Sequence, residues 1–252
     1  MSFKVPADRY DAFMGRWSRL LAPALADFAG IRDFVRVLDV GCGTGMLTAE
    51  LVRRVGAACV AAADPSPPFV AAMRERFPDV DVREAGAESM PFDDGAFDAA
   101  LAQLVVHFIP DPVAGLREMR RVTRDGGVVA ACVWDFGSGR GPLDLFWEEA
   151  AVVRPGVVDE RALPGTQEGQ LQALFAAAGI GDITATALQV TLDLPGFDAW
   201  WAPFMHGVGP AGQLVASLDD HDQARLREGC RRRLPDGAFQ LTASAWAARG
   251  EA

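Results

Sequence analysis

Hydrophobic positions in the first half of the chain form short runs that alternate with helical patterns. Apolar runs that hold strands lie at residues 34–40, 58–64, 80–85, 96–108 and 126–136, and helical patterns lie between them at 45–56, 67–77 and 111–123. Asp111 and Pro112 suit the cap and the first position of the last of these helices. Because single helices connect strands that are apolar on both faces, we expect a parallel sheet covered by helices on both sides.

The second half of the chain has a different pattern. Its first part, residues 137–170, is rich in glycine and proline. Helices are predicted at 142–153 and 168–179, strands of alternating polarity at 183–194 and 239–248, and a helical, aromatic insertion at 195–235. These patterns predict one α/β domain over residues 1–252, with a doubly wound sheet and insertions in its second half.

Composition excludes several classes of function. The 252 residues carry a formal net charge of −10 at pH 7, which disfavours a nucleic-acid partner. No apolar run reaches the ~20 residues that span a bilayer, and the N-terminus lacks the apolar core of a signal peptide, so we expect a cytoplasmic protein without a membrane span. The four cysteines are scattered, without the paired spacing of zinc sites, so neither a disulfide nor a bound metal is expected.

A glycine-rich loop, RVLDVGCGTG at residues 36–45, follows the first predicted strand and precedes a helix. That order brings backbone N–H groups close to a ligand. Met46 replaces the third glycine of a dinucleotide fingerprint, and Asp39 disfavours a pyrophosphate while suiting an ammonium or sulfonium group. Asp64 ends the next strand, where a carboxylate accepts hydrogen bonds from a ribose diol. The loop therefore favours a positively charged nucleoside ligand over a nicotinamide dinucleotide.

Several segments in this order resemble one known family. VLDVGCGTG and AADPSPPFVAAM, followed by residues 86–112 and 118–134, are similar to the class I S-adenosylmethionine-dependent methyltransferases, in the small-molecule and quinone-type (type 11-like) subgroup. The resemblance implies a seven-stranded Rossmann-like sheet whose last strand, here 239–248, runs antiparallel. It also divides the domain into a helical lid at 1–30, a cofactor-binding core at 31–137, and a second half at 138–252 with substrate-lid insertions.

The resemblance further implies which residues surround the methionine part of S-adenosylmethionine. Asp39, Gly41 and Gly43 would line it from the glycine loop, and Gln103 would face it from the end of the fourth strand. Arg16, in the lid, would close over the methionine carboxylate, since arginine binds carboxylates bidentately. The alternative for Arg16 is a solvated surface charge, and the sequence leaves both interpretations open.

The nucleoside part is expected to lie on the following loops. Asp64 would hold both ribose hydroxyls, and Pro65 would lie near the adenine. Ala87 and Glu88 would read the adenine edge from the loop after the third strand. Gly86 departs from the family here, because a polar residue is common before this alanine.

The acceptor side of the site is expected to be apolar, because aromatic residues crowd the lid and the second half of the chain. The candidates for contact with a substrate are Tyr10, Trp17, Trp134, Trp201 and His206. Trp17 is equally compatible with packing in the core. The insertion around Trp201 and His206, residues 195–213, suits an apolar small-molecule chamber at the carboxyl ends of the strands.

The sequence names no catalytic base. His107 and His206 are the candidates for proton transfer, whereas His221 lies in a run of acidic residues and is expected in solvent. The fourth strand ends in Gln103-Leu104-Val105-Val106 and lacks the Asn-Pro-Pro-Tyr motif common in enzymes that methylate amide or nucleobase nitrogens. A free small molecule, with an oxygen, carbon or nitrogen acceptor, is therefore expected.

Three hypotheses follow from these observations. The first is methyl transfer from S-adenosylmethionine to a small-molecule acceptor by in-line displacement, in a monomer or homodimer. The second is a non-catalytic module that binds S-adenosylmethionine. The third, a nicotinamide-dependent oxidoreductase, is disfavoured by Met46.

Overall fold

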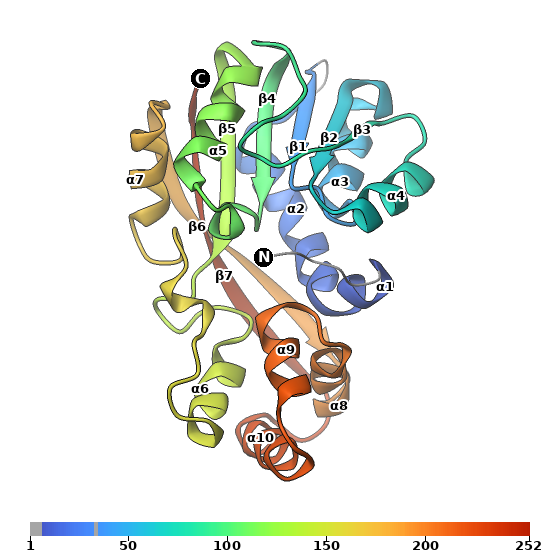
Figure 1. Cartoon of the computed structure of the whole chain (residues 1–252), viewed down its shortest axis with the longest axis vertical. Helices are drawn as coiled ribbons and strands as arrows, with labels where there is room; N and C mark the ends of the chain where they lie inside the picture. Colours follow the sequence, from blue (N-terminus) through green and yellow to red (C-terminus); the bar gives the residue numbers. More distant parts are fainter. Residues whose placement is uncertain (1–6, 33–34) are drawn as a thin grey trace.

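A computed structural model describes residues 7–32 and 35–252 and contains a seven-stranded sheet between helical layers (Figure 1). The strands are β1 (Val37–Val40), β2 (Val60–Asp64), β3 (Asp81–Glu84), β4 (Phe97–Gln103), β5 (Thr123–Trp134), β6 (Gly181–Leu194) and β7 (Phe239–Glu251). Their order across the sheet is β3-β2-β1-β4-β5-β7-β6. The first five strands are parallel, and β7 pairs antiparallel with both β5 and β6. The seven-stranded sheet with an antiparallel last strand is therefore confirmed.

Helices connect the parallel strands and cover both faces of the sheet. The α-helices of the described residues are α1 (Ala7–Tyr10), α2 (Arg16–Phe28), α3 (Met46–Val55), α4 (Pro67–Arg76), α5 (Pro112–Val122), α6 (Asp144–Val153), α7 (Gln170–Ala177), α8 (Phe197–Trp201), α9 (Gly209–Ser217) and α10 (Asp220–Arg233). Short helical turns are η1 (Asp11–Gly15, π-helical), η2 (Ala57–Cys59), η3 (Val106–Phe108), η4 (Glu160–Ala162) and η5 (Ala202–His206). Asp111 accepts a hydrogen bond from Ala114 N and Pro112 opens α5, as the sequence predicts.

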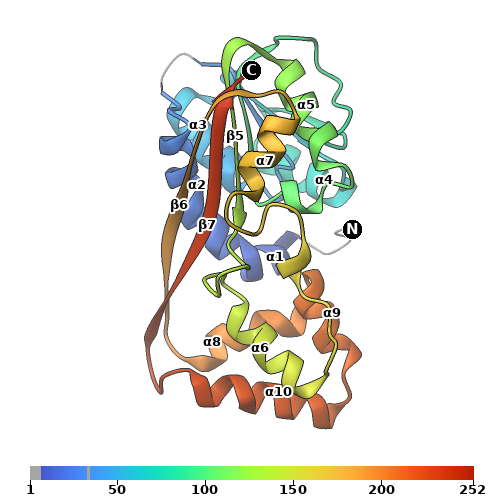
Figure 2. The same cartoon turned by 90° about the vertical axis from the view of Figure 1, so that its left-hand side faces the viewer.

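Two apolar clusters hold these layers together. Helices α2 and α3 lie on one face of the sheet and α5 and α7 on the other, as Figure 2 shows. Buried side chains of α2 and α3 belong to one cluster, and those of α5 and α7 belong to the other. Alternate strand residues separate the clusters: Leu101 belongs to the first and Ala102 to the second. This alternation arises because successive side chains of a strand point to opposite faces.

A helical lobe of α6, α8, α9 and α10 lies beyond the carboxyl ends of the parallel strands and is here called the lower lobe (Figures 1 and 2). Most of it is inserted between β6 and β7, and α6 follows β5. Its aromatic side chains, including Phe146, Trp200 and Phe204, are buried in the same cluster as the first face of the sheet. The lower lobe and the sheet therefore share one core.

The N-terminal segment is part of that core. The side chains of Phe13, Trp17, Leu21 and Leu25 are all buried, and α2 packs against α3 and β6. The sequence assigned residues 1–30 to a lid. In the structure α2 is a core layer, and Tyr10 and Ser18 of this segment line the site described below.

Candidate functional site

A cavity of about 340 Å³ opens where β1, β2 and β4 end, and is here called the first cavity. Its walls come from the glycine loop after β1, the turn after β2, the loop after β3 and the end of β4. The predicted residues that line it are Tyr10, Asp39, Gly41, Gly43, Asp64, Pro65, Ala87, Glu88 and Gln103. The carboxyl ends of parallel strands are where open α/β sheets bind ligands, so the topology brings these dispersed residues together.

Two glycines shape the floor of the first cavity. Gly41 has φ +68°, and a Cβ built on it would lie 2.6 Å from the side-chain methyls of Val105. Gly43 has φ +54° and no atom within 4 Å of the same position, although it lines the cavity. Left-handed backbone favours glycine at both positions. At Gly43 the missing side chain leaves room for a ligand to approach the main chain.

Asp64 is held by backbone donors at the edge of this floor. Its Oδ2 accepts from Gly43 N at 2.9 Å and its Oδ1 from Ser66 N at 2.8 Å. Burial raises its pKa, and the two hydrogen bonds oppose that shift. Each carboxylate oxygen keeps a second lone pair, so Asp64 can accept two more hydrogen bonds from a diol.

Asp39 lies deeper, with 1% of its surface exposed. Thr48 Oγ1 donates to its Oδ2 at 2.6 Å. Burial raises the pKa of Asp39 from 3.8 to about 7; the Thr48 hydrogen bond opposes this rise, and the charge of Asp64 adds to it. A buried carboxyl that ionises near neutrality is well placed to receive a cation, because a nearby positive charge favours its ionised form.

Gln103 provides an acceptor with no partner. Its Nε2 donates to Ser18 O at 3.0 Å, whereas its Oε1 is buried and receives no hydrogen bond from the described residues. The next residue, Leu104, has φ +62°, a conformation uncommon for a residue with a branched side chain. Such backbone strain concentrates at functional sites. No glycine or asparagine marks this turn in the sequence.

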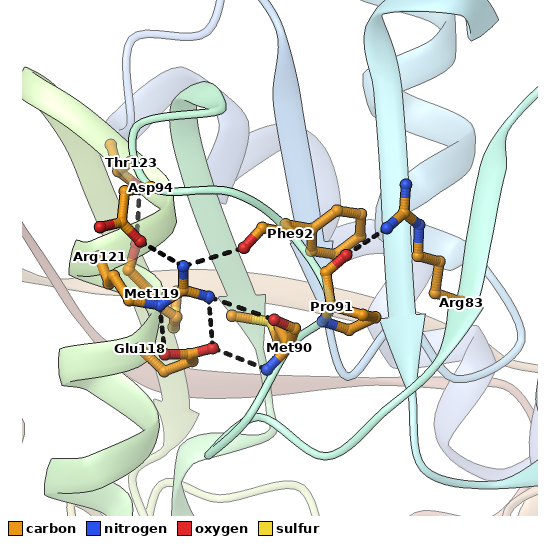
Figure 3. A network of polar contacts seen from close by, with 9 residues as sticks. All are labelled: Arg83, Met90, Pro91, Phe92, Asp94, Glu118, Met119, Arg121 and Thr123. Atoms are coloured by element: carbon orange, nitrogen blue, oxygen red, sulfur yellow. Dashed lines mark hydrogen bonds and ion pairs between the residues drawn. The ribbon is translucent and has the colours of Figure 1, made fainter.

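The loop after β3 is fixed to α5 by the network in Figure 3. Arg121 donates to Phe92 O at 2.9 Å and forms ion pairs with Glu118 and Asp94, and Glu118 accepts from Met90 N at 2.7 Å. This network anchors the chain between β3 and β4, of which Ala87 and Glu88 are part. Glu88 accepts from Asp111 N at 3.0 Å, so its carboxylate also ties the loop to the start of α5.

The π-helical turn η1 is fastened to the glycine loop by three residues that the sequence did not single out. Thr44 Oγ1 donates to Asp11 Oδ1 in a short hydrogen bond. Arg76 forms an ion pair with Asp11 at 3.0 Å and donates to Thr44 O at 2.7 Å. This connection holds Tyr10 against Phe69, with ring centroids 5.4 Å apart, and both rings line the first cavity.

Other predicted residues lie elsewhere. Arg16 donates to Ala199 O of α8 at 2.9 Å, so its guanidinium joins the N-terminal segment to the lower lobe. Trp17 is buried edge-to-face against Trp134, with ring centroids 6.1 Å apart. Neither Arg16 nor Trp17 is among the residues lining the first cavity. A role for Arg16 at the cofactor therefore has no support from this arrangement.

Two further candidates lie in the lower lobe. Trp201 is buried and packs against Phe197 and Phe204. His206, at the end of η5, is half-buried, and its Nδ1 has no hydrogen-bond partner among the described residues. Neither side chain lines the first cavity or the smaller one described next. Contact of either with a substrate stays a prediction.

A smaller cavity of about 40 Å³, here called the inner chamber, adjoins the first cavity. Tyr10, Leu104 and Phe108 line both. Trp134 and His107, two of the predicted residues, line the inner chamber, together with Glu160, which the sequence did not single out. Glu160 lies in the glycine- and proline-rich tract, where no motif marks it; in the structure it is buried and accepts a hydrogen bond from Trp147 Nε1 of α6 at 3.0 Å.

Cys42 lines the first cavity between the two glycines. Burial, followed by the charges of Asp39 and Asp64, raises the pKa of its thiol well above the ordinary value. All four cysteines are free. Within the described part of the chain, no three His, Cys, Asp or Glu side chains gather as metal ligands, and no helix has the length and apolar character that crossing a membrane requires.

The chain is similar to known methyltransferases. A family model described as a methyltransferase domain matches residues 38–131. A demethylmenaquinone methyltransferase of a Mycobacterium species is 39% identical over 132 residues, which cover 52% of this chain and 54% of that protein. The chain thus spans about half the length of these curated relatives. Uncharacterized protein Rv1403c of Mycobacterium tuberculosis is 28% identical over 243 residues, covering 87% of this chain and 83% of that protein.

A solved structure extends the likeness over the whole fold. Haemonchus contortus phosphoethanolamine N-methyltransferase 2, in complex with phosphomonomethylethanolamine and S-adenosylhomocysteine, is similar with a TM-score of 0.58 and 15% sequence identity. The similarity covers 97% of this chain and 59% of that one. At this identity it supports the architecture of the sheet and its helices.

Proposed function

Because this chain belongs to the class I S-adenosylmethionine-dependent methyltransferases, we propose that it transfers a methyl group from S-adenosylmethionine to a small-molecule acceptor. The observation that carries the proposal is the first cavity. There, two buried carboxyls and a glycine loop meet at the ends of β1 and β2. The glycine loop lacks the third glycine of a dinucleotide fingerprint, because Met46 stands at that position.

The residues of the first cavity fit the cofactor. Gln103 Oε1 lacks a hydrogen bond and is buried, so an ammonium donor would satisfy it. Asp39 would stabilise the same positive charge from below. Asp64 would accept from the two ribose hydroxyls, and the open space over Gly43 would admit the ligand to the main chain.

Methyl transfer requires the protein mainly to position the acceptor next to the methyl group. S-adenosylmethionine, when bound, supplies a methyl group already activated on a positively charged sulfur. The chain must hold an acceptor atom about 3 Å from that methyl group and exclude water, which accounts for much of the acceleration of such reactions. The rings of Tyr10 and Phe69, which line the cavity, are suited to exclude water from it.

Binding and turnover test the proposal together. We expect titration calorimetry to give dissociation constants in the micromolar range or tighter for S-adenosylmethionine and S-adenosylhomocysteine, and no measurable heat for NAD. Purified protein with methyl-labelled S-adenosylmethionine and a metabolite extract should transfer the label to a small molecule. Tight cofactor binding without any labelled product would instead favour the non-catalytic module, and NAD binding would favour an oxidoreductase.

A further inference from the structure

The two edges of the sheet are built differently. β3, at one edge, has four residues, three of which are charged: Asp81, Arg83 and Glu84. β6, at the other edge, has 14 residues and pairs with β7 alone in the described part of the chain. Figure 2 shows β6 and β7 as a long ribbon that runs from the sheet to the lower lobe. An edge strand offers unpaired N–H and C=O groups, which proteins protect by short length, charge or proline.

The middle of β6 has none of these protections. Residues 183–192, ITATALQVTL, contain no charged residue and no proline. From Thr184 to Leu194 the pairing with β7 is regular, because its one irregularity lies between Gly181 and Thr184. The whole chain carries a net charge of −10, so a strip without charge is where a second copy can approach without like charges directly opposite each other.

The two faces of β6 are covered in different halves of the strand. In the first half, Ile183 and Ala185 pack against the apolar cluster that contains side chains of α5 and α7. Thr184 and Thr186 point to the opposite face, because successive side chains of a strand alternate, and both are exposed. The first half of β6 is therefore covered on one face and bare on the other.

In the second half of β6 the covered face is the opposite one. Leu188, Val190 and Leu192 belong to, or pack against, the cluster that contains side chains of α2 and the lower lobe. Gln189 and Thr191, which point to the other face, are exposed. The face that is bare in the first half is thus covered here, and the face that is covered in the first half is bare.

This pattern is complementary to itself. When two copies of β6 pair antiparallel with full overlap, Leu188 of one copy lies opposite Leu188 of the other. Thr186 then lies opposite the second copy's Val190, and Thr191 opposite its Ala185, so on both faces a bare half of one strand meets a covered half of the other. The helices of one copy therefore lie beside the bare half of the second copy and do not meet its helices.

The same register separates the acidic residues at the ends of β6. Asp182 lies opposite the second copy's Leu194, and Asp193 lies opposite its Ile183. Like charges directly opposite each other would destabilise the pair, and this register places none in that position.

We propose that β6 is a self-association surface, along which two copies of the chain pair antiparallel about a two-fold axis at Leu188, so that the two seven-stranded sheets become continuous. The occupant is a second copy, because covered and bare halves match only when the incoming strand carries the same pattern. The first cavity lies at the ends of β1, β2 and β4, away from this edge, so the proposal does not depend on the proposed function.

Cysteine cross-linking tests the register. Leu188→Cys places two thiols at opposite positions of an antiparallel pair, where Cα atoms lie about 4.5–5.5 Å apart, within reach of a disulfide. Thr184→Cys is the matched control, because its two thiols would stand roughly 27 Å apart along the strands. Under mild oxidation, Leu188→Cys should give mostly cross-linked dimer on a non-reducing gel. Thr184→Cys and the wild type, whose four cysteines are free, should give traces only.

Analytical ultracentrifugation of the full chain measures the association itself. The wild type should form dimers with a dissociation constant in the micromolar range or tighter. Thr186→Lys places a charge on the bare half of the edge and should raise that constant about tenfold. Gln240→Lys, an equally exposed change on β7, one strand in from the edge, should leave it within about twofold. Both variants should keep the circular dichroism of the wild type.

Three results would overturn the proposal. They are a wild type that stays monomeric at about 100 µM, a dimer that Thr186→Lys and Gln240→Lys weaken equally, and cross-linking of Thr184→Cys as complete as that of Leu188→Cys. Failure of the proposed function would appear separately, as protein that does not bind S-adenosylhomocysteine, and it would leave these measurements unchanged.

Discussion

The first cavity and the inner chamber adjoin, yet they are built in different ways. The first cavity is polar on its floor, and segments that follow successive strands of one sheet supply most of its walls. The inner chamber is mainly apolar, and residues from the N-terminal segment, β5, η4 and the lower lobe close it. The geometry of the first depends mainly on the loops at the ends of the strands, whereas that of the second depends on how the lower lobe packs against the sheet.

This difference suggests that the two cavities bind different kinds of ligand. A site at the ends of hydrogen-bonded strands keeps its shape with little help from other parts of the chain, which suits a ligand shared by a whole family. A site closed by inserted helices changes with the insertion, which suits a ligand particular to one member. Substitutions in the two regions should therefore have separable effects, and the following experiments measure that separation.

The largest effect is expected from Asp64→Ala. It removes the acceptor for both ribose hydroxyls, each hydrogen bond to a charged group contributing about 1.5–3 kcal/mol. The affinity for S-adenosylhomocysteine should fall by roughly 10²–10⁴-fold by calorimetry. Glu84→Ala, at the register partner of Asp64 on β3, is the control and should bind normally. Equal affinities in the two variants would remove Asp64 from the site.

Trp17→Ala should instead lower the stability of the protein, because Trp17 lies where the sheet packs against the lower lobe. Its ring is 2% exposed and packs against Trp134, so the loss of a large buried side chain should lower the free energy of unfolding by about 3–5 kcal/mol. Urea unfolding measures this. Leu20→Ala, on the same helix but 39% exposed, should cost far less. A Trp17 variant as stable as the wild type would support the interpretation of this segment as a removable lid.

The smallest effect concerns pH. The pKa of Asp39 is about 7 in the folded protein and 3.8 ordinarily, so the folded state holds a proton that the unfolded chain releases. Its contribution to stability is therefore complete below about pH 4 and is lost as the pH rises through 7. Because Asp39→Asn cannot titrate, the stability difference between wild type and variant should change by up to ~1.4 kcal/mol per pH unit in this window.

The control for that measurement is Asp93→Asn, an exposed carboxyl in the loop before β4. The difference between wild type and this variant should stay constant across the same pH range. A constant difference for Asp39→Asn as well would mean that Asp39 ionises like an exposed carboxyl and that the first cavity is more solvated than its geometry implies.

The sheet and the first cavity were predictable because their signals are local. Apolar runs of strand length mark β1 to β5, and Asp39, Gly43 and Asp64 stand at the ends of these runs, where parallel topology brings them to one edge. Alternating polarity likewise marks β6 and β7, which form the antiparallel pair. Each of these features needs only neighbouring residues to be recognised.

The remaining features depend on contacts between distant segments, and no local pattern encodes them. Arg16 looks like a carboxylate ligand, but its guanidinium reaches carbonyls of α8 in the lower lobe. Glu160 is one of several charged residues in a polar tract, and no local pattern indicates that Trp147 donates a hydrogen bond to it. The connection of Asp11 to Thr44 spans two segments that only the folded chain brings together.

The position of Cys42 in the first cavity bears on the reactivity of its thiol. A cysteine thiolate is a strong nucleophile, and the proposed function would place it in the same hollow as an electrophilic methyl group. Burial and the charges of Asp39 and Asp64 keep this sulfur protonated, and a protonated thiol does not attack. The carboxylates that would hold the methyl donor thereby also protect the protein from alkylating its own binding loop.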